Sequence, residues 1–233
     1  SLPLKEGWQD KISDTSMQAK SQIRREVNKL AKFPKQRDEL AQSFMKLRDL
    51  GFIREYDQLT KEERVKIDGH KQRYVLPVSI AYKPDSVSTT VRLCMDASAR
   101  AGGKLSLNDC LHRGNTSFCM GNLVTKWRAH EVGVATDLSN FYPSIKLREE
   151  DWHLQFLWMI PSLKVGDEPK LYVVTSLIFG VASVAAQSEA AMAKIAERYP
   201  DLKEVLEARY VDDLATSVKS IEQAEDIRDR TTK

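Results

Sequence analysis

Two adjacent carboxylates, Asp212 and Asp213, separate two short apolar segments, residues 205–211 and 214–218. Both segments have the composition of strands, and a connection this short can join two strands only as a hairpin. The chain therefore contains an antiparallel strand pair with two carboxylates at its tip. Tight hairpin turns accept Asp, so turn chemistry is one interpretation of the pair. The other is function, because adjacent carboxylates repel each other and the flanking residues are apolar.

A third carboxylate stands at the end of another strand pattern. Residues 132–136 predict a short buried strand that ends at Asp137. If this strand is the neighbour of the hairpin in one sheet, Asp137 and Asp212 meet at the same edge. Charge at the end of an apolar strand costs free energy unless it is paired or bound to a metal ion. Mg²⁺ prefers such a place, with one or two protein carboxylates, waters and substrate phosphates as ligands.

The remaining pattern predicts an α+β protein with an antiparallel sheet, because long helices precede strands that alternate with helices and hairpins. Apolar residues recur at three- and four-residue steps from position 16, and Pro34 and Gly51 punctuate the first two helices. Helices are expected over residues 16–33, 36–50, 117–129, 149–154, 183–198 and from near 220 to the end. Strands are expected over residues 74–82 and 91–96, with a turn at 83–86, and a hairpin over 155–160 and 171–177. Residues 57–73 are polar and predict a loop with one helical turn.

Length and composition exclude several classes of protein. The 233 residues are 42% hydrophobic and 30% charged, which are values of a globular chain and not of a disordered or fibrous one. The longest apolar run, residues 177–186, is about half of what a membrane span needs. The first residues lack the basic start and apolar stretch of a signal peptide. Because position 1 is not Met, we expect the sequence to be a piece of a longer polypeptide.

The cysteines predict neither a disulfide framework nor a metal centre. There are three of them, and an odd, small number favours a reducing, intracellular setting. Cys110, His112 and Cys119 offer three zinc ligands, but their spacing fits no common site and a fourth ligand is missing. Ordinary packing is the better explanation of these residues.

The charge distribution is more informative than the net charge of +3. Seven cations and one anion lie between Lys20 and Arg37 on a predicted helical region. A basic stripe of this kind suits contacts to phosphates. A solvated helix face is the competing interpretation, and the stripe alone does not decide between the two.

The order and spacing of several motifs resemble the reverse transcriptases. Residues 210–213 (Tyr-Val-Asp-Asp) look like the metal-binding hairpin of that family. Residues 137–142 look like its first metal motif, an Asp followed five residues later by an aromatic residue. Residues 92–98 resemble the strand of the fingers that carries a triphosphate-binding arginine. The resemblance covers nearly the whole chain, from about Met17 onward.

Within that family the similarity is greatest to the BEL/Pao group of LTR retrotransposons. Residues 96–99 followed by 106–111 resemble a motif of this group, and residues 179–183 match its version of the motif before the palm helix. Residues 50–54 and 74–77 fit the upstream part of the fingers. Phe179 departs from the retroviral pattern, which has Gln at the equivalent place.

The resemblance implies a right-hand polymerase fold that is represented by fingers and palm only. Residues 1–130 would form the fingers and residues 131–233 the palm, whose antiparallel sheet is backed by helices. The thumb, the connection and the RNase H domain of the family would lie in the rest of the parent polyprotein. The parent protein would act in the cytoplasm, within virus-like particles and without a membrane partner.

The implied catalytic residues are the three aspartates. Asp137 and Asp212 would bind two Mg²⁺ ions, for which Mn²⁺ substitutes, and the backbone of Leu138 would add a ligand. Asp213 is the third aspartate of the family, for which a turn-stabilising role competes with direct metal contact. The implied activity is RNA-directed DNA polymerisation, in which a primer 3′-hydroxyl attacks a deoxynucleoside triphosphate.

The resemblance also implies residues that bind the nucleotide. Arg92 and Lys83 are candidates for the triphosphate, since Arg binds phosphate through two hydrogen bonds and Lys acts as a point charge. Tyr142 resembles the steric gate, whose ring leaves no room for a ribose 2′-hydroxyl. Phe179 would pack against the nucleotide, and Gly180 would allow close approach of the backbone.

Template and primer are the implied partners. An RNA–DNA hybrid is recognised through its shape, phosphates and 2′-hydroxyls, and the basic stripe supplies Lys20, Arg24 and Arg25 as contacts. Tyr210 would lie near the primer terminus. Without a thumb, the grip on the duplex should be weak and strongly dependent on salt.

Three other interpretations compete with a reverse transcriptase. The chain could be a non-catalytic nucleic-acid-binding or assembly module derived from such a domain, although the complete set of motif residues argues against decay. A nucleotidyl cyclase would show Gly-Gly-Asp/Glu-Glu-Phe, whereas Gly102 and Gly103 are followed by Lys104 and Leu105. A viral RNA-dependent RNA polymerase would show Gly-Asp-Asp and a polar residue at the gate.

Overall fold

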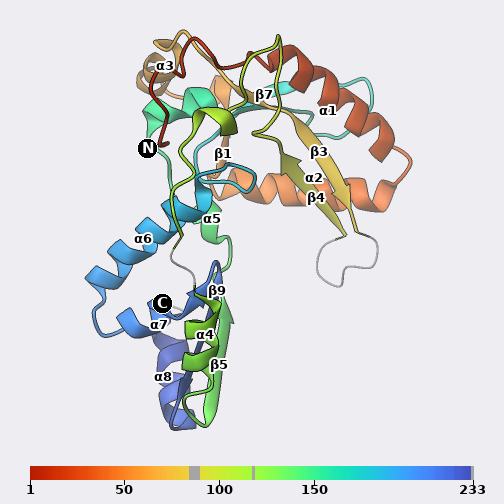
Figure 1. Ribbon diagram of the computed structural model, residues 1–233. Coiled ribbons are helices and arrows are strands. Elements are labelled where there is room, and N and C mark those ends of the chain that lie inside the picture. Colours follow the sequence, from red (N-terminus) through yellow and green to blue (C-terminus); the bar gives the residue numbers. More distant parts are fainter. Residues whose placement is uncertain (84–89, 117–118, 232–233) are drawn as a thin grey trace. The chain divides into compact units, whose positions relative to one another are not determined.

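The computed structural model describes residues 1–83, 90–116 and 119–231, and Figure 1 shows its helices and strands. The chain divides into two compact units, each built from two stretches of sequence. Unit 1 comprises Ser1–Arg113 and Tyr142–Val184, and unit 2 comprises Gly114–Phe141 and Ala185–Lys233. The mixture of helices with antiparallel and mixed sheets confirms the α+β prediction.

Two long helices open unit 1. Helix α1 (Ser16–Leu30) buries Ala19, Ile23, Val27 and Leu30, which is the predicted three- and four-residue spacing of one apolar face. Helix α2 (Pro34–Asp49) begins with Pro in its first turn, where a missing N–H costs nothing. It ends before Gly51, whose φ of +69° suits the left-handed residue that closes a helix.

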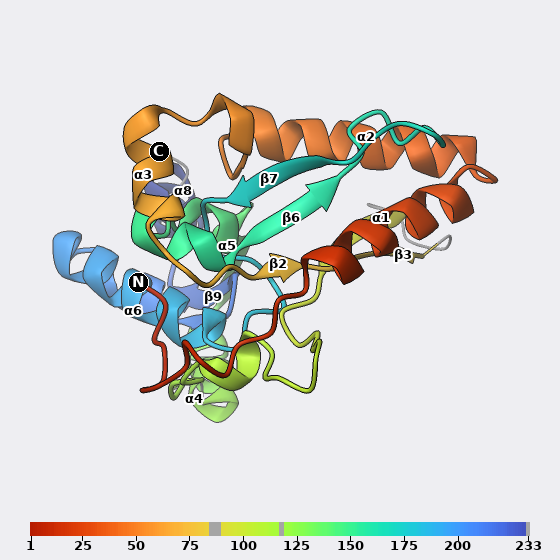
Figure 2. The ribbon, with the colours of Figure 1, turned by 90° about the horizontal axis from the view of Figure 1, so that it is seen from above.

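The larger sheet of unit 1 has four strands in the order β1-β7-β6-β2. These are β1 (Ile53–Glu55), β7 (Lys170–Val174), β6 (Phe156–Met159) and β2 (Val75–Leu76). The β6–β7 pair is the predicted hairpin, while β2 runs parallel to β6. Helix α1 packs against β2 and β6, and α2 packs against β1; Figure 2 shows both helices running alongside this sheet.

A separate two-stranded sheet consists of β3 (Val78–Tyr82) and β4 (Val91–Met95). The sequence predicts a single strand over residues 74–82, but the strand is broken at Pro77 into β2 and β3, which belong to different sheets. Pro lacks the N–H that a continuous ladder requires, and its carbonyl accepts a hydrogen bond from the Asp96 N–H at 2.9 Å. The turn predicted at residues 83–86 lies almost entirely outside the described residues.

Short helical segments complete unit 1. The expected loop over residues 57–73 is wrong, because it contains a full α-helix with a capping box between Thr60 and Glu63. The segment predicted as helical at 149–154 is a 3₁₀ helix. The segments are η1 (Tyr56–Gln58), α3 (Lys61–Asp68), η2 (Asn108–Cys110), η3 (Glu149–Leu154) and α5 (Phe141–Ser144), which begins at the last residue of unit 2's first stretch.

Unit 2 is built on a three-stranded antiparallel sheet in the order β5-β9-β8. Its strands are β5 (Val132–Asp137), β8 (Arg209–Tyr210) and β9 (Asp213–Val218). Its helices are α4 (Met120–Trp127), α6 (Val184–Arg198), α7 (Lys203–Glu207) and α8 (Ile221–Thr231). Helices α4, α7 and α8 pack against the central strand β9, so the sheet is backed by helices.

Two predictions about unit 2 are corrected. Residues 203–207 are helical, so the strand predicted over 205–211 is reduced to β8. Strand β5 is mostly exposed rather than buried, because it is an edge strand with β9 as its one neighbour in the sheet. Its valines are half-buried, and its other residues face solvent.

The observed division into units differs from the expected boundary at residue 130. Strands β6 and β7 lie in the expected palm segment, yet they pair with β1 and β2 from the first half of the chain and so belong to unit 1. Hydrogen bonding between distant segments, and not position in the sequence, decides which unit a segment joins. No helix in the described part of the chain combines the length and the apolar character that crossing a membrane requires.

Candidate functional site

The hairpin of unit 2 has Val211 and Asp212 as its two loop residues. Tyr210 pairs with Asp213 across the β8–β9 ladder, so the chain reverses within these four residues. Two-residue hairpin loops require positive φ values, and Val211 has a φ of +60°. A β-branched residue in this region is strained, so the surrounding structure must hold the turn in place.

The β5–β9 register brings the three aspartates to one end of the sheet. Asp137, the last residue of β5, is the partner of Asp213 in the ladder. One step further along, the Leu138 N–H donates a hydrogen bond to the Asp212 carbonyl oxygen at 2.8 Å. The prediction that the two strands are neighbours, with Asp137 and Asp212 meeting at one edge, is therefore confirmed.

The aspartates are more exposed than a buried strand would make them. Asp137 and Asp213 are exposed and Asp212 is half-buried. Water can therefore solvate their charges, and the argument that an apolar strand end forces a metal ion there is wrong. Within the described residues, none of the three carboxylates makes an ion pair or a hydrogen bond to another side chain, so their oxygens are available to a ligand.

The oxygens of the three aspartates suit a hard cation, but they do not form a site in which protein groups supply all the ligands. Among the described residues, no group of three or more His, Cys, Asp and Glu side chains is arranged to hold a metal ion. Carboxylate oxygens without protein partners nevertheless suit Mg²⁺, which takes one or two carboxylates and completes its shell with waters and phosphates. The edge of the sheet offers an open site of this kind.

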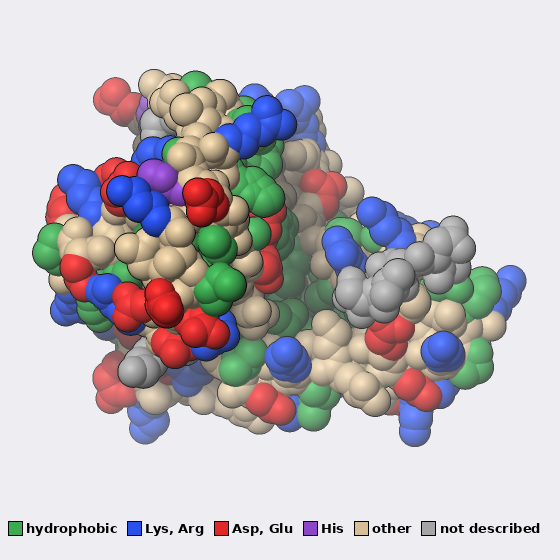
Figure 3. Space-filling model, turned by 90° about the horizontal axis from the view of Figure 1, so that it is seen from below, with side chains coloured by type: hydrophobic (Ala, Val, Ile, Leu, Met, Phe, Trp, Pro, Cys, Tyr) green, Lys and Arg blue, Asp and Glu red, His purple; other side chains and the backbone are tan. Residues whose placement is uncertain are grey.

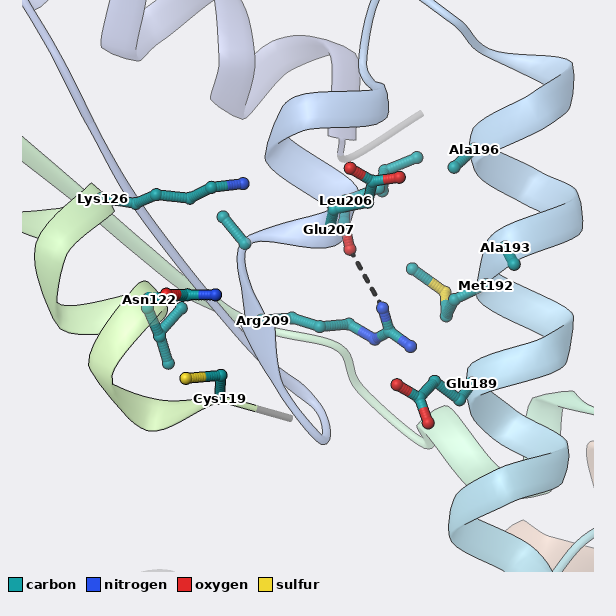
Figure 4. Close-up of a pocket in the computed structure, with 12 residues that line it drawn as sticks. Cys119, Asn122, Lys126, Glu189, Met192, Ala193, Ala196, Leu206, Glu207 and Arg209 are labelled. Carbon is teal, nitrogen blue, oxygen red and sulfur yellow. Dashed lines mark hydrogen bonds between the residues drawn. The ribbon is translucent and has the colours of Figure 1, made fainter. Parts of the chain in front are cut away.

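A pocket of about 320 Å³ lies behind the hairpin within unit 2, lined by residues of α4, α6, α7 and β8 (Figure 4). Arg209 extends from β8 toward α6, and its Nη1 donates a hydrogen bond to the Leu206 carbonyl oxygen at 3.2 Å. Burial lowers the pKa of Arg209, while the nearby Glu189 opposes this effect. The side chain therefore links the base of the hairpin to the end of α7.

Apolar packing anchors the segment that follows Asp137. Leu138 and Phe141 pack against a buried cluster formed by Met192, Ala196, Leu202 and Leu206. The cluster and the Leu138–Asp212 hydrogen bond together fix the backbone on both sides of the candidate site.

The candidate nucleotide-binding residues belong to unit 1, whereas the three aspartates belong to unit 2. The rings of Tyr142 and Phe179 contact each other with centroids 4.6 Å apart and planes at 61°. Tyr142 is buried and Phe179 is 66% exposed. A Cβ added to Gly180 would lie 2.7 Å from the Met95 carbonyl oxygen, so the loop rests directly on the end of β4.

The two candidate triphosphate ligands are both exposed on the β3–β4 pair. Arg92 lies on β4 opposite Ala81, and the alternate residues Arg92, Cys94 and Asp96 are exposed. Lys83 follows β3, and its N–H donates to the Thr90 carbonyl oxygen at 2.8 Å. Arg92 and Lys83 therefore lie toward the same end of the strand pair, and the contact of Gly180 with Met95 lies at the other end.

Two of the three predicted contacts in the basic stripe already have partners within the chain. Lys20 Nζ lies 4.8 Å from the centre of the Trp158 ring, and Arg24 forms an ion pair with Glu168 at 2.6 Å. Arg25 is exposed and has no such partner among the described residues. On the face shown in Figure 3, side chains of both signs are interspersed. Tyr210 is 46% exposed, on the hairpin of unit 2.

One polar residue of unit 1 lies within a matched motif but is not among the predicted site residues. The side chain of Asn108 makes three hydrogen bonds, two of them to the loop that carries Phe179 and Gly180. Asn108 lies within the quoted motif of residues 106–111, and an amide that can both donate and accept is the signal that could have marked it.

Comparison with known proteins adds no identification. No protein-family model matches the chain, and no curated protein matches it. The functional interpretation therefore depends on the motifs and on the geometry described above.

Proposed function

We propose that the chain is the fingers and palm part of an RNA-directed DNA polymerase from an LTR retrotransposon polyprotein of the BEL/Pao type. The observation that carries the proposal is the register of β5 and β9, which sets Asp137 opposite Asp213 and beside Asp212. The sequence motifs alone predict the identity of these residues. Their meeting at one sheet edge is a further observation that supports the proposal.

In this proposal Asp137 and Asp212 would hold two Mg²⁺ or Mn²⁺ ions, with the Leu138 backbone as a further ligand. Such ions, when bound, lower the pKa of a primer 3′-hydroxyl and neutralise charge on the leaving pyrophosphate. The protein's part is to hold the carboxylates in place, because phosphoryl transfer mostly needs positioning and electrostatic stabilisation. The ladder fixes Asp137 and Asp213, and the strained turn fixes Asp212.

The nucleotide would be bound by residues of unit 1. The exposed guanidinium of Arg92 suits a triphosphate, and Lys83 adds a positive charge. Tyr142 would exclude a ribose 2′-hydroxyl, and its contact with Phe179 limits the movement of both rings. The exposed Phe179 ring and the backbone at Gly180 would form the surface on which the deoxynucleotide packs.

Template and primer would be an RNA–DNA hybrid held through its phosphates. Of the three stripe residues named as contacts, Arg25 is the most available, because Lys20 and Arg24 already have partners. Tyr210 would lie near the primer terminus. In the parent element the thumb and RNase H domain would complete the enzyme, which would act in the cytoplasm within virus-like particles.

Primer extension on an RNA template tests the proposal. The full chain is assayed with deoxynucleotides in Mg²⁺ and in Mn²⁺, at low salt and high protein concentration, beside Asp137→Asn. The control is Asp229→Asn, which changes an exposed carboxylate that pairs with its neighbour Arg228. We expect extension by the wild type and the control, and none by Asp137→Asn.

Two results would count against the proposal. Equal extension by wild type and Asp137→Asn would show that these carboxylates are not the metal site. Tight hybrid binding without extension by any form would favour the non-catalytic nucleic-acid-binding or assembly module.

A further inference from the structure

The side chain of Asn108 joins two loops of unit 1 that are far apart in the sequence. Its Nδ2 donates hydrogen bonds to the Gly180 carbonyl oxygen and to Ser98 Oγ, both at 2.8 Å. Its Oδ1 accepts a hydrogen bond from the Ala182 N–H at 2.7 Å. One amide thus ties the loop after β7 to the turn after β4, using both of its polar atoms.

Asn108 is itself held in place by the backbone. Its N–H donates to the Ala97 carbonyl oxygen at 2.9 Å, and it begins the 3₁₀ helix η2. The adjacent Leu107 is completely buried. The amide therefore extends from a rigid position, and the loop at residues 179–182 is the part whose geometry depends on it.

In the loop that Asn108 holds, Gly180 has no room for a side chain, whereas the neighbouring Phe179 is exposed. Gly180 has a φ of +95°, and a Cβ there would lie 2.7 Å from the Met95 carbonyl oxygen. Phe179, directly before it, is 66% exposed. The Asn108 hydrogen bond holds the backbone at Gly180, and the Tyr142 ring contacts the Phe179 ring. The Phe179 ring therefore has a defined orientation although its surface faces solvent.

We propose that Asn108 is a positioning residue for the incoming deoxynucleotide. It holds the Gly180 carbonyl and the Ala182 amide so that the Phe179 ring presents a fixed face to the nucleotide before binding. This inference rests on the proposed polymerase function. Preorganisation of a loop raises affinity by removing the entropy cost of ordering it, so the loss of Asn108 should weaken nucleotide binding more than it slows chemistry.

Two substitutions separate the bonds that Asn108 makes. Asn108→Ala removes all three hydrogen bonds. Asn108→Asp keeps an acceptor for the Ala182 N–H but sets a carboxylate oxygen against the Gly180 carbonyl oxygen. Ser98→Ala is the matched control, because it removes the one partner of Asn108 that lies outside the loop.

The experiment measures hydrogen exchange at the Ala182 amide together with KM and kcat for a deoxynucleotide in single-nucleotide extension. We expect Asn108→Ala to accelerate exchange at Ala182 and to raise KM about tenfold, while kcat changes little. Asn108→Asp should keep Ala182 protected and still raise KM. Ser98→Ala should resemble the wild type in both measurements, and circular dichroism shows whether each variant is folded.

Three results would overturn the inference in distinguishable ways. Unchanged exchange at Ala182 in Asn108→Ala would show that the amide does not hold the loop. Faster exchange with an unchanged KM would show that the loop is held but does not position the nucleotide. A wild type that neither binds nor incorporates nucleotides, with Ala182 protected, would overturn the proposed function and the positioning role together while leaving the loop contact intact.

Discussion

Asp137 and Asp213 are direct partners in the β5–β9 ladder, although they come from different stretches of the sequence. This pairing turns two separate sequence motifs into one group of carboxylates. It also sets a limit on the geometry, since residues opposite each other in an antiparallel ladder have Cβ atoms about 5 Å apart. The backbone hydrogen bonds of the ladder would therefore set the distance between the carboxylates of a cation site at this edge.

The loop at Gly180 should not tolerate a side chain. In Gly180→Ala the new Cβ would meet the Met95 carbonyl oxygen and the residue would keep a φ of +95°. Gly166 is the matched control, because it has the same φ and no atom within 4 Å of the added Cβ. We expect urea denaturation to show a loss of about 1 kcal/mol for Gly166→Ala and about 3 kcal/mol for Gly180→Ala. Equal losses would show that the close contact is not present in solution.

The turn at Val211 should become more stable with glycine. A β-branched residue at a φ of +60° is strained by about 1–3 kcal/mol, and the conformational entropy of glycine offsets about 0.5–1 kcal/mol of the relief. Val211→Gly should therefore raise the free energy of unfolding by about 1 kcal/mol. Val218→Gly, at the far end of β9 and without a positive φ, should lower it. The prediction fails if both substitutions destabilise the protein to the same extent.

His153 should make the stability of the protein depend on pH. It is 2% exposed, and its ring stacks on that of His70 with centroids 3.8 Å apart. Burial, and next the charge of His70, lower the pKa of His153 from its ordinary value of 6.5 to about 4. Between these values the unfolded chain binds the proton and the folded one does not, so stability falls as the pH falls from 6.5 toward 4.

His153→Phe keeps a ring against His70 and removes the titration. Chemical denaturation at pH 7 and pH 5 should show that the wild type loses about 2 kcal/mol more than the variant over this interval. The same pH dependence in both proteins would contradict the assignment.

Tyr142 should control the choice of sugar. Replacing it by Val opens space beside Phe179. In the proposed function this is the space from which the ring excludes a 2′-hydroxyl. We expect Tyr142→Val to raise incorporation of ribonucleotides relative to deoxynucleotides in single-nucleotide extension. Because the ring is buried, the variant should also be less stable, by about 3 kcal/mol. Unchanged discrimination by a folded variant would mean that the ring only fills space.

Local patterns allowed much of the fold to be predicted. The apolar face of α1 and the β6–β7 hairpin follow from periodicity and turn residues, because these depend on neighbours in the sequence. Helix α3 was missed because it has little apolar periodicity, with Ile67 as its one buried residue. Its capping box at Thr60 and Glu63 was the available signal, and it shows that end contacts can define a short polar helix.

The errors at the site have a different physical origin. Residues 132–136 have the composition of a buried strand, but burial depends on how many neighbours a strand has in the sheet, and β5 has one. The contacts of Asn108 join residues 72 positions apart, as in its bond to Gly180, so no local pattern could predict them. Sequence motifs supplied the identities of the three aspartates, and the strand register supplied their proximity.

Binding of Mn²⁺ to the full chain tests the central claim most directly. Electron paramagnetic resonance is used to count bound ions in the presence of a deoxynucleotide, for the wild type, Asp137→Asn, Asp212→Asn and the control Asp229→Asn. We expect two bound ions for the wild type and the control, and a loss of at least tenfold in affinity when either Asp137 or Asp212 is changed. Wild-type affinity in Asp137→Asn would show that the carboxylates at the end of β5 and in the β8–β9 turn do not form the cation site.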